Sequence, residues 1–196
     1  MENRLAVDFS QLDLPIAEEE ARELLVRHGI ESSVLDIVDI ARSKIGKTIY
    51  KRGAKSGEWP EAMDCSGFSK WLYGQLGIWL PRHSIDQRDS GEDISVSKLQ
   101  AGDLVFTDGW RNYYWNDQND GVGHVGIATS TNSVIHAANS KRNLVEDYLE
   151  EFMNNKEARG ITRIADLPNT VTLVMKTDDI MESSTAVRWR ILQHLK

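Results

Sequence analysis

The sequence predicts an α+β fold, in which helices come first along the chain and strands follow. Apolar residues recur at helical spacing as far as about residue 77, and short apolar or β-branched runs bounded by turn residues follow from about residue 103. No internal repeat interrupts this order. With 196 residues the chain fits one main domain with extensions, and it is long enough to bury a hydrophobic core.

The composition excludes several classes of protein. The chain has 23 basic and 30 acidic residues, a net charge of −7, and this acidic balance argues against a nucleic-acid-binding protein. No stretch approaches the roughly 18 uncharged apolar residues of a membrane span, and residues 1–10 lack the apolar run of an export signal. We therefore expect a cytoplasmic protein, with non-classical export or a phage origin as alternatives.

Two helices are expected near the N-terminus. Residues 17–28 place acidic side chains in the first turn and basic side chains in the last turn, which suits the helix dipole. A second helix follows, because Ser33 and Asp36 have the spacing of a capping box and apolar residues recur at helical spacing as far as Gly46.

The rest of the chain is predicted to hold one more helix and then mostly strands. Residues 50–63 contain glycine and proline and indicate a loop, after which a helical pattern runs from Cys65 to Gly77. The later elements are expected as strands at 103–107, 124–129, 133–138, 161–167 and 170–176, and as helices at 144–153 and within 187–195.

The single cysteine lies where the loop meets this helix. Asp64 is placed to cap the helix, so Cys65 falls in its first turn. The positive end of the helix dipole and the unpaired N–H groups there favour the thiolate, which is the form that attacks a carbonyl carbon. A lone cysteine is also compatible with a buried, inert side chain, so the thiol alone does not establish catalysis.

Two histidines in neighbouring predicted strands supply partners for the thiol. The separation of His124 and His136 is even, and a hairpin centred on Ser130 would set them opposite each other on one face of the sheet. A two-residue turn at residues 131–132 would place them on opposite faces, so a wider loop at about 129–131 is required. Cys65 would then be the nucleophile, His124 its general base, and His136 the group that orients His124.

Two alternatives to this triad remain open. In the first alternative, one or both histidines have no catalytic role and only fill the surface of the sheet. A metal site is disfavoured, because one cysteine and two histidines without close ligand spacing make an unusual zinc set.

Five blocks of sequence together resemble the NlpC-type cell-wall cysteine peptidases. In chain order they are DCSGF, LPRHSIDQ, LQAGDLVF, GHVGIAT and VIHAA. The resemblance covers about residues 34–167 and implies a papain-like fold, in which a helix carrying the cysteine packs on an antiparallel sheet carrying the histidines. We accordingly expect an N-terminal helical extension at 1–32, a catalytic domain at 33–167 and a C-terminal strand and helix extension at 168–196.

The resemblance assigns catalytic roles to individual residues. Cys65 matches the family's nucleophile, His124 matches its general base, and His136 matches its third catalytic position. Tyr50 matches a tyrosine that stands beside the cysteine and helps to form the oxyanion site.

The resemblance also implies where substrate binds. Asp64 and Ser66 match positions that in related enzymes receive the free amino end of a short cell-wall peptide, and a carboxylate beside a hydroxyl suits an ammonium group. Arg82, Ser84 and Trp110 complete the expected substrate-binding set. Trp110 belongs to an aromatic-rich segment between two predicted strands, which is either a substrate wall or lid or a loop that packs on itself.

The implied activity is hydrolysis of amide bonds in peptidoglycan stem peptides or muropeptides, typically between D-glutamate and a diamino acid, through a thiolate and an acyl-enzyme. The expected partner is a small peptide or muropeptide, and no cofactor or metal is needed. The sequence does not indicate an oligomeric state. One alternative keeps the fold but makes the protein an amidase, deamidase or acyltransferase on a non-wall substrate. Another is a non-catalytic binding module, which the intact cysteine and histidines disfavour.

Overall fold

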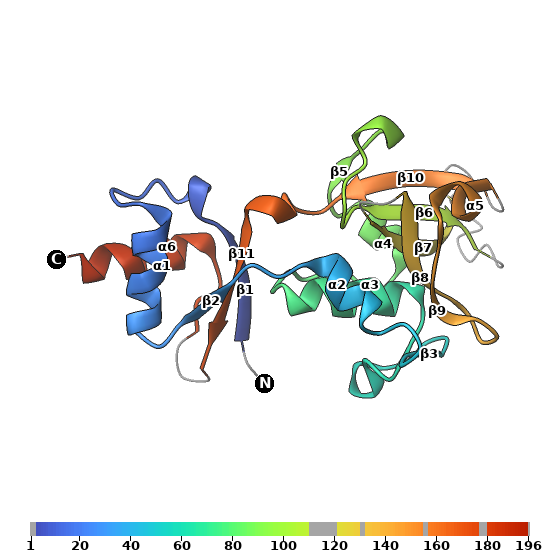
Figure 1. Cartoon of the computed structure of the whole chain (residues 1–196), viewed down its shortest axis with the longest axis horizontal. Helices are drawn as coiled ribbons and strands as arrows, with labels where there is room; N and C mark the ends of the chain where they lie inside the picture. Colours follow the sequence, from blue (N-terminus) through green and yellow to red (C-terminus); the bar gives the residue numbers. More distant parts are fainter. Residues whose placement is uncertain (1–2, 110–120, 130–131, 155–156, 177–179, 196) are drawn as a thin grey trace. The chain divides into compact units, whose positions relative to one another are not determined.

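Two compact units make up the computed structural model, which describes residues 3–109, 121–129, 132–154, 157–176 and 180–195 (Figure 1). The terminal unit combines Met1–Leu35, Gly74–Ile78 and Asp166–Lys196. The central unit combines Asp36–Tyr73 and Trp79–Ala165. The two chain ends, which we expected as separate extensions, therefore belong to one unit.

The terminal unit is a three-stranded antiparallel sheet in the order β1–β11–β2, accompanied by two helices. Leu5 and Val7 in β1 turn toward the core while their neighbours alternate away, as the period of a strand requires. The elements are β1 (Asn3–Asp8), α1 (Glu18–Arg27), β2 (Glu31–Ser33), β11 (Thr170–Met175) and α6 (Ser184–His194), with 3₁₀ turns at Phe9–Gln11 and Leu167–Asn169.

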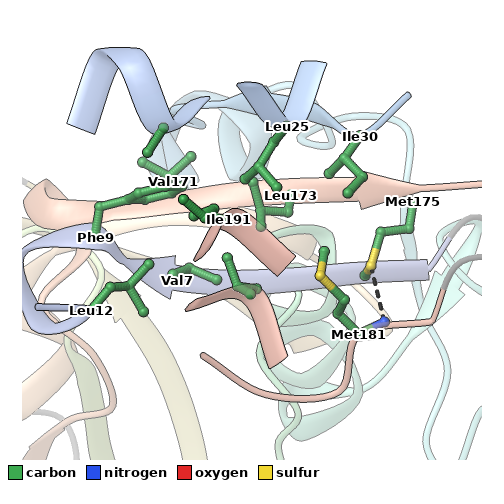
Figure 2. Close-up of a cluster of buried hydrophobic side chains, with 12 residues drawn as sticks. Val7, Phe9, Leu12, Leu25, Ile30, Val171, Leu173, Met175, Met181 and Ile191 are labelled. Carbon is green, nitrogen blue, oxygen red and sulfur yellow. Dashed lines mark hydrogen bonds between the residues drawn. The ribbon is translucent and has the colours of Figure 1, made fainter. Parts of the chain in front are cut away.

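A hydrophobic core joins these helices to their sheet. Figure 2 shows Leu25 of α1 and Ile191 of α6 beside Leu173 of β11, and all three side chains are fully buried. Fully burying a side chain of this size contributes about 1.5–3 kcal/mol. The backbone N–H of Met181 also donates to the sulfur of Met175 at 3.3 Å, which ties the segment before α6 to the edge of this core.

The second helix begins later than the sequence predicts. Ser33 pairs with Thr172 in the ladder between β2 and β11, so it cannot be the first residue of a capping box. The helix α2 (Ile37–Arg42) is instead capped by Asp36, whose carboxylate accepts from the N–H groups of Val38 and Asp39 at 2.8 and 3.1 Å.

The central unit is built on a six-stranded antiparallel sheet in the order β5–β10–β6–β7–β8–β9. A parallel pair, β3 and β4, encloses the predicted loop. The strands are β3 (Ile49–Tyr50), β4 (Ala62–Met63), β5 (Glu92–Asp93), β6 (Leu104–Asp108), β7 (Val122–Ala128), β8 (Ser133–Asn139), β9 (Asn143–Tyr148) and β10 (Ala158–Arg163).

Short helices complete the central unit. Besides α2 they are α3 (Cys65–Gln75), α4 (Ser84–Arg88) and α5 (Leu149–Asn154), with 3₁₀ turns at Ser56–Glu58 and Val96–Lys98. The last two residues of α3 fall in the terminal unit. In the part of the chain that the structure describes, every helix is too short or too polar to cross a membrane.

The helix predicted for residues 144–153 is wrong in its first half. The side-chain oxygen of Asn139 stabilises a turn after β8, because it accepts from the N–H groups of Lys141 and Arg142 at 2.9 and 3.1 Å. Asn143 then adopts a left-handed backbone conformation with φ of 60°. This tight turn sends β9 back along β8, and only after Tyr148 does the chain become helical as α5.

Candidate active site

Asp64 holds the turn that presents Cys65 at the start of α3. Its Oδ1 accepts from the N–H of Gly67 at 2.8 Å, as a helix cap does, and its Oδ2 accepts from the N–H of Gly53 at 2.8 Å. A Cβ at Gly67 would lie 2.9 Å from Asp64 Oδ1, so the close approach depends on glycine. The half-buried thiol is thereby fixed where the loop from Tyr50 meets the helix.

Arg82 neutralises this buried carboxylate. Its Nη1 and Nη2 donate to Asp64 Oδ1 and Oδ2 at 2.9 and 2.6 Å, and Nη1 also donates to Ser66 Oγ at 3.0 Å. Asp64 therefore accepts two bonds from Arg82 and two from backbone N–H groups. A substrate ammonium group, which the resemblance would place on Asp64, has to compete with Arg82 for the same oxygens.

Gln87 fixes the first turn of α3 from behind, a role that no single feature of the sequence predicts. It is fully buried, and its Nε2 donates to the carbonyls of Ser66 and Pro81, both at 2.9 Å. Its Oε1 accepts from Ser69 Oγ at 2.6 Å. The block that contains Arg82, Ser84 and Gln87 thus supports the helix start as well as lining the site.

The two histidines meet across β7 and β8. His124 Nε2 lies 2.8 Å from His136 Nδ1, and both side chains are buried. The expected pairing of His124 directly opposite His136 is wrong by two residues, because Ile127 pairs with Ile135. An even shift keeps both side chains on one face, so the histidines still meet along the diagonal.

Gly126 provides the space for this diagonal contact. A Cβ at Gly126 would lie 2.2 Å from Val134 Cγ1 and 3.2 Å from His136 Cβ. The ring of Phe152 in α5 packs against both imidazoles, with centroid distances of 5.6 Å to His124 and 4.8 Å to His136. The two imidazoles are therefore held in place by packing against Phe152 and by the hydrogen bond between them.

An ion pair lies behind the histidines. Asp147 Oδ2 is 3.0 Å from His136 Nε2, and Arg142 binds both oxygens of Asp147, with 2.8 Å between Nη1 and Oδ2. The hydrogen bond from Arg142 lowers the pKa of Asp147, although burial opposes the effect. Asp147 falls in the segment predicted as a helix and Arg142 in the turn before it, which is why the sequence pattern does not bring them to the site.

A cleft of about 1010 Å³ joins the helix and the strands within the central unit. His136 lies behind His124 and does not line it, and Trp110 lies outside the described residues. The predicted residues that line the cleft are Cys65, His124, Tyr50, Asp64, Ser66, Arg82 and Ser84, and further lining residues include Arg52, His83, Asp86 and Asn139.

Known proteins share this fold and much of this sequence. The model of the NlpC/P60 family matches residues 47–163. A solved structure, the NlpC/p60 domain of the peptidoglycan hydrolase SagA, superposes with a TM-score of 0.51 at 29% identity, covering 65% of this chain and 96% of that one. The α+β fold predicted from the sequence is confirmed.

Two curated relatives carry the comparison further. A probable endopeptidase of Corynebacterium glutamicum (strain R) is 39% identical over 139 residues, which are 71% of this chain and 56% of that protein. A gamma-DL-glutamyl hydrolase of Bacillus subtilis (strain 168) is 31% identical over 108 residues, which are 55% of this chain and 24% of that protein. The chain spans about half the length of the first curated relatives it matches. On this evidence it belongs to the NlpC/P60 family.

Proposed function

We propose that this protein is a cysteine peptidase that hydrolyses amide bonds in peptidoglycan stem peptides or muropeptides. The observation that carries the proposal is the cleft in which Cys65, at a capped helix start, and His124, backed by His136 at 2.8 Å, line one space. A binding module has no need for a thiol and a supported imidazole in the same cleft.

The acylation step follows from the chemistry of these groups. His124 takes the thiol proton of Cys65, and the thiolate attacks the amide carbonyl carbon, forming a C–S bond while the carbonyl π electrons move onto oxygen. N–H groups at the start of α3 and the Tyr50 side chain at the cleft are suited to stabilise that oxyanion. When the tetrahedral intermediate collapses, the C–N bond breaks and His124 gives its proton to the leaving amine.

Deacylation uses the same residues in reverse. His124 removes a proton from water, the hydroxide attacks the thioester carbon, and the C–S bond breaks to release the carboxylic acid product. At the end of this step His124 is protonated and Cys65 is again a thiolate, so the two charges cancel. Every proton transfer is made by side chains already described.

The bond we propose joins the γ-carboxyl of D-glutamate to a diamino acid. The gamma-DL-glutamyl hydrolase among the relatives supports this choice. The cleft also presents both charges, because Arg52 and Asp86 are among its lining residues. Such a lining suits a short peptide that carries several carboxylates together with amino groups.

Incubation with defined stem peptides tests the proposal. Wild type and Cys65→Ala are compared on a γ-D-glutamyl-diamino acid peptide and on its α-linked isomer, with products identified by mass spectrometry. We expect wild type to cleave only the γ-linked peptide, and Cys65→Ala to be slower by at least about 10³-fold. Cleavage by the mutant, or no cleavage by either protein, would contradict the proposal.

A further inference from the structure

Asp147 and Arg142 lie behind the histidines and line no part of the cleft. We propose that Asp147, held by Arg142, is a positioning residue that fixes the tautomers of both histidines, so that the basic nitrogen of His124 serves Cys65. The inference rests on the proposed cysteine chemistry and adds to it a residue that touches neither the substrate nor the thiol.

The first step is the state of the carboxylate. Arg142 binds both oxygens of Asp147, and its hydrogen bond lowers the pKa of that carboxyl group. Asp147 is therefore ionised at neutral pH and only accepts hydrogen bonds. Its Oδ2 lies 3.0 Å from His136 Nε2, so this ring nitrogen must carry the proton.

The second step is the tautomer of His124, which the tautomer of His136 determines. A neutral His136 with its proton on Nε2 presents a lone pair at Nδ1. His124 Nε2, 2.8 Å away, must then donate, so the lone pair of a neutral His124 lies on Nδ1. Because Nε2 is bonded to His136, Nδ1 is the ring nitrogen left to take the proton of Cys65. The reverse arrangement would put a proton on His124 Nδ1 and leave the ring unable to act as the base.

The surroundings of His136 favour a fixed arrangement of protons along Asp147, His136 and His124, which we call the proton chain. Titratable groups face His136 from two strands, His124 on β7 and Asp147 on β9, whereas α5 packs the apolar ring of Phe152 against it. Farther out, the negative charge of Glu151 acts on Arg142. The side chain of His136 is 7% exposed, so water has little access to exchange one tautomer for the other.

The same strand supplies a matched control. Glu146 precedes Asp147 in β9 and is bound through both carboxylate oxygens by Arg42, at 2.8 and 2.9 Å. Successive residues of a strand point to opposite faces, and Glu146 also accepts from Ser133 Oγ, away from the histidines. Glu146→Gln therefore weakens a comparable ion pair without touching the proposed proton chain.

Nitrogen-detected NMR of the histidine rings tests the tautomers without any turnover. In full-length Cys65→Ala, at a pH high enough that the ring nitrogen signals show each ring to carry a single proton, we expect that proton at Nε2 in both His136 and His124. Adding Asp147→Asn should mix the tautomers of both rings, whereas adding Glu146→Gln should not. Protonation of either ring at Nδ1 in the Cys65→Ala protein would overturn the inference, even if the double variant failed to fold.

Kinetics in the otherwise unmodified protein give the second readout. We expect Asp147→Asn to lower kcat by about 10- to 100-fold with little change in KM, the usual cost of losing a partner that orients an imidazole. The pH profile of Cys65 alkylation should move toward that of an ordinary thiol, and Glu146→Gln should change neither quantity by more than about twofold. An unchanged alkylation profile in folded Asp147→Asn, or equal changes in both variants, would contradict the role. If no stem peptide is cleaved but the alkylation shift appears, the proton chain stands and the proposed substrate fails.

Discussion

The two walls of the cleft are held together by different kinds of bonds. On the helix wall, Asp64 and Gln87 bind the side chains of Arg82 and Ser69, and their other partners there are backbone N–H and carbonyl groups of fixed hydrogen-bonding character. On the strand wall, His124, His136 and Asp147 bind one another through ring nitrogens and a carboxylate, whose protonation depends on pH. In the proposed mechanism, the helix wall positions the thiol and the strand wall accepts and returns its proton.

The largest expected effect is the loss of proton transfer on the strand wall. His124→Ala should lower kcat by about 10³- to 10⁴-fold, because no other group in the proposed mechanism accepts the thiol proton. The free energy of unfolding should fall by much less than the increase in activation free energy that corresponds to this loss of kcat. Turnover of a γ-D-glutamyl peptide and urea denaturation of the same samples would check both, and an active His124→Ala enzyme would refute the division between the walls.

On the helix wall the expected loss is in stability. Gln87→Leu leaves the carbonyls of Ser66 and Pro81 and the Ser69 hydroxyl without this partner, which should lower the free energy of unfolding by about 2–4 kcal/mol. Urea denaturation measures the loss. The control is Gln11→Leu at an exposed position, which should change stability by less than about 0.5 kcal/mol. Equal stability of the two variants would contradict the account of this wall.

Gly126 tests how tightly the strand wall is packed. Gly126→Ala introduces a Cβ 2.2 Å from Val134 Cγ1, and the required shift should cost about 1–3 kcal/mol of stability and lower kcat by displacing the histidines. Gly74→Ala is a matched control, because a Cβ at this helical position meets nothing within 4 Å and should stabilise the protein by about 0.5–1 kcal/mol. Thermal unfolding of both variants checks the signs, and a stable, fully active Gly126→Ala protein would show a looser wall.

The smallest expected effect is in acid stability. The pKa of Asp147 is lower in the folded protein than its ordinary value, so its contribution to stability is present above about pH 4 and is lost as pH falls through the folded value. Asp147→Asn removes this contribution. When the pH is lowered from about 6 to about 3, the urea midpoint should therefore fall less in the variant than in wild type. A drop of the same size in both proteins would show that Asp147 gains no stability from its ion pair.

The two walls also differ in how far the sequence predicts them. Asp64, Cys65 and Ser66 are adjacent in the chain, so local helix chemistry predicts their positions at the start of α3 as the structure has them. The even separation of the histidines predicts that they share a face, and they do, because strand parity survives an even shift in register, although their exact pairing is wrong. Asp147 is not predicted, because the apolar spacing of residues 144–153 also fits a helix and the turn at Asn143 decides for a strand.

The terminal unit shows the same limit. The helix predicted at 17–28 lies within one residue of α1 at each end, whereas α6 begins three residues before the helix predicted at 187–195. The strands β1 and β2 are not predicted, since each finds its partner far away along the chain in β11. Pairing between the two ends of a chain is a long-range event, and a local pattern carries little information about it.

The pH dependence of Cys65 alkylation tests the central claim most directly. Reaction of wild type and His124→Ala with iodoacetamide, followed from about pH 4 to pH 10, reports the thiolate without any assumed substrate. We expect rapid alkylation of wild type well below the ordinary cysteine pKa of about 8.5, and loss of this low-pH reaction in His124→Ala. Wild-type Cys65 that reacts only as an ordinary thiol, with the same profile in His124→Ala, would contradict it.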